Sequence, residues 1–260
     1  MHPVILQVGP VVVGAYALML TLAFLFGTIL AVIRAKKYDI PHYEVINLVI
    51  IILIASIVGA RLLFILQHKK VFLNDPMRML YMWNGGLSYY GGLLFAIIGF
   101  IWWNIRKNIN IARMLDIFTP SFALGFFFVR IGCFLNGCCF GMPTDVRWGV
   151  VFPLDSAAGR IHADIPLHPT QLYASVAGLI SFFLLLGAEE KFRLNNKGGL
   201  LFFLFLMFST LWRFIIENYR YQSSDLISLN WITEAQVYSM GIFIISIIMV
   251  NLIYKNKISF

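Results

Sequence analysis

The sequence predicts an all-α, polytopic membrane protein with about seven transmembrane helices. Three observations lead to this fold class. Hydrophobic residues make up 60% of the 260 residues, charged residues make up only 12%, and the apolar residues gather into long runs. A soluble protein needs a polar shell that this composition does not supply. The runs also lack the period-two alternation of a membrane barrel, so helices are the expected spanning elements.

Seven stretches approach the roughly 20 residues that a helix needs to cross about 30 Å of hydrocarbon. The expected spans are residues 11–33, 45–67, 86–104, 115–135, 169–188, 198–218 and 235–254. The first run is too long for a signal-peptide core and has no Lys or Arg before it, so we expect it to be retained. The fourth run contains a charged residue, Arg130.

The distribution of basic residues predicts the orientation. With the N-terminus outside and the C-terminus in the cytoplasm, the inner loops and the tail hold eleven of the twenty Lys and Arg residues. No internal repeat or linker stands out, so residues 1–260 are expected to form a single membrane-embedded domain. The segment near 141–168, rich in Pro, Gly and Asp, is expected to form a periplasmic cap. The net charge of +8 fits anionic lipid headgroups and gives no reason to expect nucleic acid.

The most informative residues are charges inside or at the ends of the apolar runs, namely Arg61, Arg130, Arg213, Glu217 and Arg220. A charge at the bilayer centre costs at least ~2.5 kcal/mol, so such residues indicate function. Residues 213, 217 and 220 recur at i, i+4 and i+7 and share one helix face, where Glu217 can bridge the two arginines. The expected topology places all five toward the outer leaflet, as a cationic site suited to a phosphate. The alternative is that the arginines extend to the interface and Glu217 pairs with one of them.

Two further motifs lie on the same side. The run Gly85-Gly86-Leu87-Ser88-Tyr89-Tyr90-Gly91-Gly92 opens the third span. Its glycines permit either close helix contact or backbone donation to an anion. The segment His168-Pro169-Thr170-Gln171 is typical of a helix start. It is either a cap alone or a place where His168 acts as a base.

Cys133, Cys138 and Cys139 fall within seven residues. Three thiolates could begin a zinc site, but the spacing matches no usual finger and a fourth ligand would have to come from His162 or His168. We therefore expect no metal. A Cys133–Cys138 disulfide and a thiolate nucleophile beside Arg130 stay open as alternatives. The favoured interpretation is that small thiols pack a tight turn.

Together and in this order, these segments resemble the prolipoprotein diacylglyceryl transferase family. The resemblance covers nearly the whole chain and rests on six segments: Gly14-Ala15-Tyr16, Gly59-Ala60-Arg61-Leu62, the Gly85-to-Gly92 run, Arg130 through Gly141, His168 through Tyr173, and Arg213 through Arg220. It implies a multi-pass enzyme of the bacterial inner membrane that needs no cofactor. The reaction implied moves the diacylglyceryl group of phosphatidylglycerol to the lipobox cysteine thiol of a preprolipoprotein, forming a thioether and releasing glycerol phosphate. The partners implied are phosphatidylglycerol, lipobox signal peptides and membrane lipids.

The site residues that we expect include those carried over by motif from this resemblance. The expected catalytic residues are Arg130, Arg213, Tyr90 and Glu217. The expected substrate-binding residues are Arg130, Arg213, Arg220, Tyr16, Arg61, Asn136, Gly141, His168 and Gln171.

Four positions depart from the family pattern. Tyr90 stands where many members have histidine, Cys133 and Cys138 stand where they have asparagine and glutamate, and Ser209 stands where tyrosine is frequent. Tyr90 or His168 could replace the histidine as base, or the arginines could ionise the substrate thiol unaided. Two alternatives follow: a paralogue with changed or lost lipid-transfer activity, and an anion transporter. The absence of an inverted repeat in the sequence disfavours the transporter.

Overall fold

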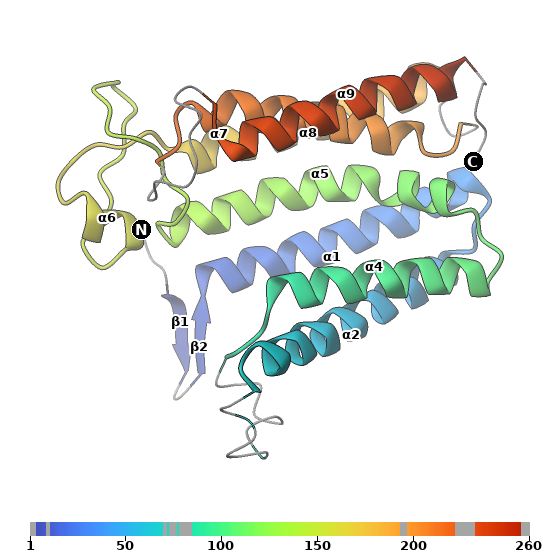
Figure 1. The fold of residues 1–260 in the computed structure, drawn as a ribbon, viewed down its shortest axis with the longest axis horizontal. Coiled ribbons are helices and arrows are strands. Elements are labelled where there is room, and N and C mark those ends of the chain that lie inside the picture. The colour runs from blue at the N-terminus through green and yellow to red at the C-terminus, as the bar shows by residue number, and fades with distance from the viewer. Residues whose placement is uncertain are drawn as a thin grey trace. The chain divides into compact units, whose positions relative to one another are not determined.

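The structure is a computed structural model that describes residues 4–8, 11–69, 72, 77, 85–192, 197–221 and 232–255 (Figure 1). Arg193 and Lys257, which contribute to the charge bias of the inner loops, lie outside these residues. The chain divides into two compact units, one of Met1–Ala31 with Leu115–Phe260 and the other of Val32–Met114. The single-domain organisation and the N-out orientation stay predictions.

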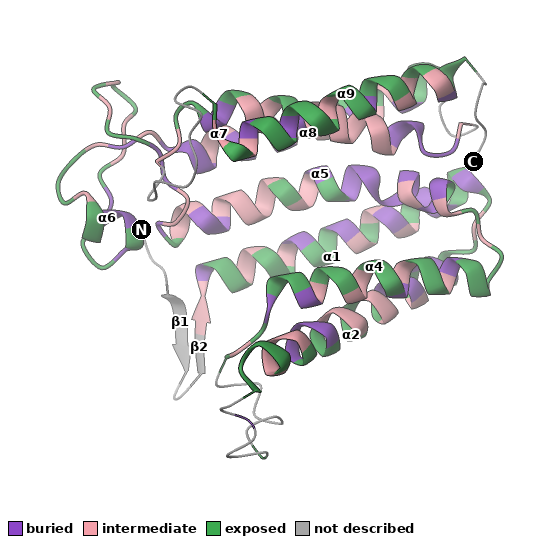
Figure 2. Cartoon of the chain, viewed as in Figure 1, coloured by how far each residue is buried: buried purple, intermediate pink, exposed green. Residues whose placement is uncertain are grey.

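Within the described residues, six helices are long and apolar enough to cross a membrane. They are α1 (Ala15–Ala35), α2 (His42–Gln67), α5 (Ile111–Leu135), α7 (Thr170–Phe192), α8 (Leu200–Glu217) and α9 (Glu234–Tyr254). They coincide with six of the seven predicted stretches, which confirms the all-α class. Exposed residues recur along these helices, drawn in green in Figure 2. Many of them are large and apolar, for example Leu20, Phe24 and Ile29 on α1. Such a surface is stable against hydrocarbon and not against water, so this is a multi-pass membrane protein.

The third predicted span forms α4 (Tyr89–Arg106), a helix of 18 residues. It is not among the six helices above, and its crossing of the bilayer stays a prediction. Residues 86–88 were assigned to this span but precede the helix. Gly85 and Gly86 have φ of 82° and 83°, which a helix does not allow.

The first span begins four residues later than predicted. Residues 11–14 belong to an antiparallel hairpin of β1 (Val4–Val8) and β2 (Val11–Gly14), in which Val8 is paired with Val11. β-Branched valines favour extended backbone. Hydropathy alone assigned these residues to the helix, because a short apolar strand and a helix turn score alike.

Within the unit Val32–Met114, α2 and α4 lie side by side. Gly91 approaches Gly59 so closely that a Cβ on either residue would overlap the backbone of the other, and Gly99 packs against Ala55. Small residues allow this contact between membrane helices. The second half of the glycine run therefore serves helix packing.

Within the larger unit, hydrogen bonds connect α5, α7, α8 and α9. Asp116 on α5 is fully buried and caps the start of α8 by accepting from the backbone N–H groups of Gly199 (2.7 Å) and Phe202 (2.9 Å). A carboxylate at this place satisfies amides that have no partner within the helix. Ser175 Oγ on α7 donates to the Phe127 carbonyl of α5 at 3.1 Å. These contacts hold three helices around the pocket described below.

The segment predicted as a cap is folded. It contains the short helix α6 (Ala157–Ile161) and a small core of Phe140, Phe152, Ala158 and Leu167. Isolated β-bridges pair Leu167 with Pro143 and with Val150. Its periplasmic location stays a prediction.

Candidate functional site

An ion-pair group of Arg213, Glu217 and Arg220 lies at the end of α8. Nη1 of Arg213 is 2.5 Å from Oε2 of Glu217, and Nη1 of Arg220 is 3.9 Å from the same oxygen. The Glu217 side chain is 5% exposed, whereas those of Arg213 and Arg220 are 32% and 27% exposed. One carboxylate between two guanidinium groups leaves a net positive charge. Guanidinium groups held in this way present fixed forks that match a phosphate.

Arg130, near the end of α5, adds a third guanidinium group to the same pocket. Its Cζ lies 4.7 Å from the centre of the Phe126 ring. Its Nε is buried and has no hydrogen-bond partner among the described residues. A buried donor without a partner costs ~1–3 kcal/mol. An acceptor on a bound ligand would remove this cost.

The three arginines line one open pocket between α5, α7 and α8, whose space is about 530 Å³ when the open solvent at its mouth is counted. The rest of its lining is mostly apolar or small: Phe126, Cys139, Thr170, Ala174, Ala177, Gly178, Ser181, Phe205, Ser209, Trp212 and Ile216. From Arg213 back to Phe205, α8 extends ~12 Å at 1.5 Å per residue. The pocket therefore joins a cationic end to an apolar length, which is the pattern of a phospholipid.

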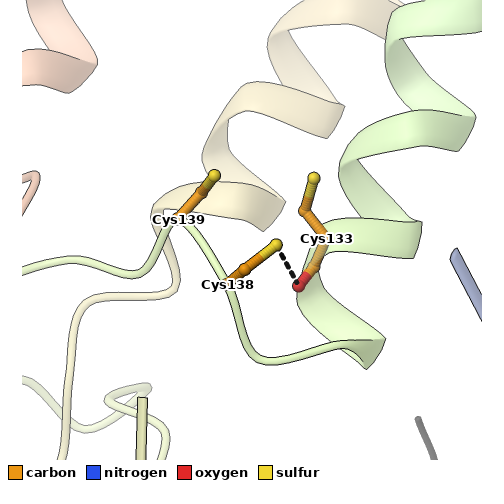
Figure 3. Close-up of side chains that lie close together, drawn as sticks. All are labelled: Cys133, Cys138 and Cys139. Carbon is orange, nitrogen blue, oxygen red and sulfur yellow. Dashed lines mark hydrogen bonds between the residues drawn. The ribbon is translucent and has the colours of Figure 1, made fainter. Parts of the chain in front are cut away.

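The three cysteines meet beside the cationic end. Cys133 lies on the last turn of α5, and Cys138 and Cys139 follow in the next turn, so that all three Sγ atoms lie within 4.8 Å of one another (Figure 3). The backbone N–H of Cys138 donates to the Cys133 carbonyl at 3.1 Å, and the Cys138 thiol donates to the same oxygen at 3.7 Å. All three are free thiols. Of the three, Cys139 lines the pocket.

Cys139 has φ of 59°, in the left-handed region that residues other than glycine seldom adopt. Such a conformation costs ~1–3 kcal/mol and persists where surrounding contacts impose it. Two of these contacts come from the start of α7, where Thr170 Oγ1 donates to the Cys139 carbonyl (3.0 Å) and Gln171 Nε2 donates to the Cys138 carbonyl (2.8 Å). The segment predicted as a helix start therefore fixes the cysteine turn.

The environment of Cys139 favours its thiolate. Hydrogen bonds from the thiols of Cys133 and Cys138, and then the positive charges of Arg220 and Arg130, hold the pKa of Cys139 well below its usual range, although burial opposes them. Cys139 is therefore the sulfur of the three that most readily carries a negative charge. The arginines that suit a phosphate also favour this charge.

Other predicted site residues surround this turn. Tyr16 packs against Gly132, next to Cys133, where a Cβ would lie 3.3 Å from the Tyr16 ring, and Asn136 follows α5 two residues before Cys138. Gly141 packs so tightly that a Cβ there would lie 2.6 Å from the carbonyl oxygens of His168 and Tyr219. The contacts of Gly141 are those of a packing residue.

His168 belongs to an aromatic group beside the turn. Its Nδ1 lies 3.1 Å from the Tyr173 hydroxyl, and its ring centre lies 5.1 Å from that of Tyr219. Trp148 Nε1 donates to the same Tyr173 hydroxyl at 2.8 Å. His168 is not among the residues that line the pocket, and its role as a base stays a prediction.

Two predicted residues lie in the smaller unit. Arg61 is 7% exposed and its Nη1 donates to the carbonyl oxygens of Gly85 and Gly86, both at 3.0 Å. It therefore fixes the first half of the glycine run. Tyr90 is 73% exposed, and its ring contacts that of Tyr89 with 5.7 Å between centres. Substrate binding by Arg61 and catalysis by Tyr90 stay predictions.

Sequence reasoning missed the apolar wall of the pocket. Ala174, Ala177, Gly178 and Ser181 recur at i, i+3, i+4 and i+7 along α7 and line it together. The spacing of these small residues could have predicted this wall of the pocket. Nothing in the sequence distinguishes Trp212 on α8, because aromatic residues are common in membrane spans.

Comparison with known proteins gives a match over nearly the whole chain. The family model described as prolipoprotein diacylglyceryl transferase matches residues 3–252. Three similar proteins carry the name phosphatidylglycerol-prolipoprotein diacylglyceryl transferase. That of Clostridium tetani is 32% identical, with 97% of this chain and 98% of that protein covered. That of Aeromonas hydrophila is 33% identical (98% and 91% covered), and that of Phenylobacterium zucineum is 31% identical (87% and 83% covered).

Proposed function

Because this chain belongs to the prolipoprotein diacylglyceryl transferase family, we propose that it transfers the diacylglyceryl group of phosphatidylglycerol to the lipobox cysteine thiol of a preprolipoprotein. The transfer forms a thioether and releases glycerol phosphate. The proposed location is the bacterial inner membrane, with the N-terminus outside and the C-terminus in the cytoplasm. Membrane lipids and lipobox signal peptides are the partners.

The observation that carries this proposal is the amphipathic pocket with three arginines at one end. Arg130, Arg213 and Arg220 hold the phosphodiester, and Glu217 fixes the last two. The acyl chains lie along the apolar wall toward Phe205. A substrate whose tails stay among membrane helices needs a pocket that is charged only where the headgroup sits.

The reaction needs a thiolate and a leaving phosphate. The sulfur attacks the glycerol carbon that carries the phosphate ester, a C–S bond forms, and the C–O bond breaks with its electron pair leaving on the phosphate. Guanidinium groups placed around that phosphate stabilise the charge that develops on it, and no covalent enzyme intermediate is required. A diacylglyceryl group on Cys139 would be a stable thioether, so Cys139 is not its carrier.

The remaining predicted residues are proposed to complete the site. Tyr16 and Asn136 border the cationic end, Gly141 and Gln171 keep the turn in place, and His168 stands beside it. Tyr90 is the proposed base, with Arg61 as a further headgroup contact. Tyr90→Phe tests the base with Tyr89→Phe as its control. A selective ~100-fold loss in kcat would assign the proton transfer to Tyr90, and equal rates would remove it from the chemistry.

The transferase proposal is tested with purified protein in detergent, phosphatidylglycerol and a lipobox peptide. The products to measure are diacylglyceryl peptide and glycerol phosphate. Arg213→Ala is expected to abolish both. The matched control is Arg160→Ala, because Arg160 is exposed and its Nη2 donates to the Asp155 carbonyl at 3.4 Å, away from the pocket lining. Absence of product from well-folded wild-type protein would contradict the proposal.

A second candidate is a paralogue that binds the lipid but has lost or changed the transfer. It is favoured by Tyr90, Cys133, Cys138 and Ser209 at the four positions that depart from the family pattern. Fold and pocket alone do not determine activity. Saturable binding of phosphatidylglycerol that depends on Arg213, without product, would support the paralogue.

A further inference from the structure

The cysteine cluster has the dimensions of a metal site. A tetrahedral zinc ion holds thiolate sulfurs at ~2.3 Å, which places them ~3.8 Å from one another. The three Sγ atoms already lie within 4.8 Å of one another, so a shift of ~1 Å or less in any pair would bring them to this geometry. Their spacing along the chain led us to expect no metal, and their distances in space change that expectation.

The cluster offers three ligands and an open fourth position. Within the described part of the chain, no histidine, aspartate or glutamate joins this group of ligand atoms. Structural zinc sites are closed by four protein ligands, whereas catalytic sites have three and leave the fourth to water or substrate. Cys133 is buried and Cys139 lines the pocket. The open position therefore belongs on the side of the pocket.

The surroundings compensate the charge of such a site. Three thiolates on Zn²⁺ carry a net charge of −1, and Arg220 and Arg130 both attract the sulfur of Cys139. The turn is also held in advance, because Thr170 and Gln171 bind the carbonyl groups of Cys139 and Cys138. Cys139 keeps its left-handed backbone in this arrangement. A ligand set fixed by outer contacts is what metal sites require.

We propose that Cys133, Cys138 and Cys139 bind one zinc ion, and that its fourth position takes the thiol of the incoming lipobox cysteine. The inference rests on the proposed transferase function. A free thiol has a pKa of ~8.5, and a thiol bound to zinc is deprotonated outright. In this inference zinc takes over the role proposed for Tyr90, because the substrate thiol loses its proton to solvent water when it binds the metal. Its sulfur then forms the bond to the glycerol carbon, and glycerol phosphate leaves with the electron pair of the C–O bond. No group is oxidised or reduced.

Zinc content tests the ligands. Full-length protein is purified in detergent under reducing, anaerobic conditions, loaded with zinc, freed of excess and measured for bound metal. We expect about one zinc per chain in the wild type and loss of most of it in both Cys139→Ser and Cys133→Ser. Arg213→Ala is the matched control, because it removes a headgroup contact and should retain the metal. Thermal unfolding and size-exclusion chromatography establish that each variant is folded.

Cobalt(II) in place of zinc tests the open position. Thiolate-to-cobalt charge-transfer absorption grows with the number of bound thiolates, so a lipobox peptide should raise it by about one third as three thiolates become four. A peptide with serine in place of the lipobox cysteine should leave it unchanged. This measurement needs no phosphatidylglycerol and no turnover.

The outcomes separate the two proposals. The inference is supported if the protein binds one zinc per chain through these cysteines and if the peptide thiol binds the cobalt. This holds even when no lipid is transferred. Absence of transfer would count against the transferase function alone. Failure to retain zinc or cobalt, or a cobalt spectrum that ignores the peptide, overturns the inference. A disulfide between two of these cysteines in protein taken anaerobically from cells also overturns it. A metal-free protein that still transfers lipid leaves only the transferase function standing.

Discussion

Replacing Arg130 with methionine should raise the stability of the ligand-free protein while it lowers kcat/KM for transfer by at least ~10-fold. Arg130 Nε is buried and lacks a hydrogen-bond partner within the described ranges, and Arg213 and Arg220 add like charge in the same pocket. Methionine has a similar length, carries no charge and makes favourable contacts with aromatic rings. Arg130→Met therefore removes an energetic cost from the empty pocket together with a contact that the phosphate needs.

The size of the effect follows from two opposing contributions. Relieving an unsatisfied buried donor gains ~1–3 kcal/mol. Losing the cation–π contact with Phe126, whose ring centre is 4.7 Å from Cζ, costs ~0.5–1 kcal/mol, part of which the methionine sulfur returns. The net gain is ~1–2 kcal/mol, which raises Tm by ~2–6 °C for a chain of this size. Loss of charge-assisted hydrogen bonds to the phosphate, at ~1.5–3 kcal/mol each, lowers kcat/KM by at least ~10-fold to ~100-fold.

The assays are thermal unfolding in detergent without lipid and steady-state transfer from phosphatidylglycerol to a lipobox peptide. Arg160→Met is the control, since Arg160 is exposed and outside the pocket lining, and it should change neither quantity. A fall in Tm of several degrees for Arg130→Met would refute the reasoning, because it would mean that the guanidinium group stabilises the empty fold. An unchanged kcat/KM would refute the role of Arg130 at the headgroup.

Three further predictions concern single contacts. Glu217→Gln removes the negative charge between Arg213 and Arg220. Because both arginines are about one-third exposed, we expect the free energy of unfolding to fall by a modest ~1–2 kcal/mol and kcat/KM for phosphatidylglycerol to fall as well. An unchanged kcat/KM would show that Glu217 does not position the two arginines. Gly141→Ala should lower the stability measured by thermal unfolding by ~1–3 kcal/mol, because a Cβ there would overlap neighbouring carbonyl groups. The control is Gly187→Ala, where a Cβ meets nothing within 4 Å and the change should be neutral or slightly stabilising. Equal effects of the two substitutions would contradict the tight packing of Gly141. Asp116→Ala should lower stability by ~1–2 kcal/mol, because the backbone N–H groups at the start of α8 lose their acceptor. The KM for phosphatidylglycerol should stay unchanged. A raised KM would place Asp116 in the substrate site.

Most of the fold could be predicted because hydrophobic length is a one-dimensional property. Runs of about 20 apolar residues located six helices with ends mostly within a few residues of those observed. The errors fall where hydropathy is not what decides the conformation. Valines at 11–13 form a strand through pairing with β1, and Gly86 leaves the helical region because its φ is positive. Neither cause is visible in a hydropathy window.

Part of the site could be predicted from helical geometry. The i, i+4 spacing placed Glu217 beside Arg213 on one face of α8, and the structure has this pair. The i+7 part of the prediction was wrong, because α8 ends at Glu217. Arg220 lies beyond the helix, forms a β-bridge with Gly141 and reaches the same carboxylate from there. Arg130 is far from them in sequence, and only its motif context placed it at the same site. The pocket walls depend on which faces of α5, α7 and α8 meet, and this is a property of tertiary packing.

The convergence of the three cysteine sulfurs could not be predicted from their spacing along the chain. Ligand patterns recognised in sequences come from regular fingers and loops, and Cys139 is brought to the others by a left-handed backbone. That conformation is imposed by side chains of Thr170 and Gln171, about thirty residues away. The residues 133–139 by themselves predicted thiols that pack a tight turn, and the structure has free thiols in such a turn. What the local sequence did not predict is that all three sulfurs lie within 4.8 Å of one another.

Intramembrane charges in this protein are of two kinds, and their sequence context does not tell them apart. Asp116 is fully buried but accepts two backbone hydrogen bonds at the start of α8, and Arg61 is nearly buried but donates to the carbonyl groups of Gly85 and Gly86. Both compensate the cost of a buried charge inside the fold. Arg130 has a buried Nε for which the described residues supply no acceptor. The cost of a charge in hydrocarbon is the same kind of cost for Asp116, Arg61 and Arg130, so burial does not distinguish them. What distinguishes Arg130 is a buried donor that the described residues leave without an acceptor. A ligand from outside the chain is therefore expected to supply that acceptor.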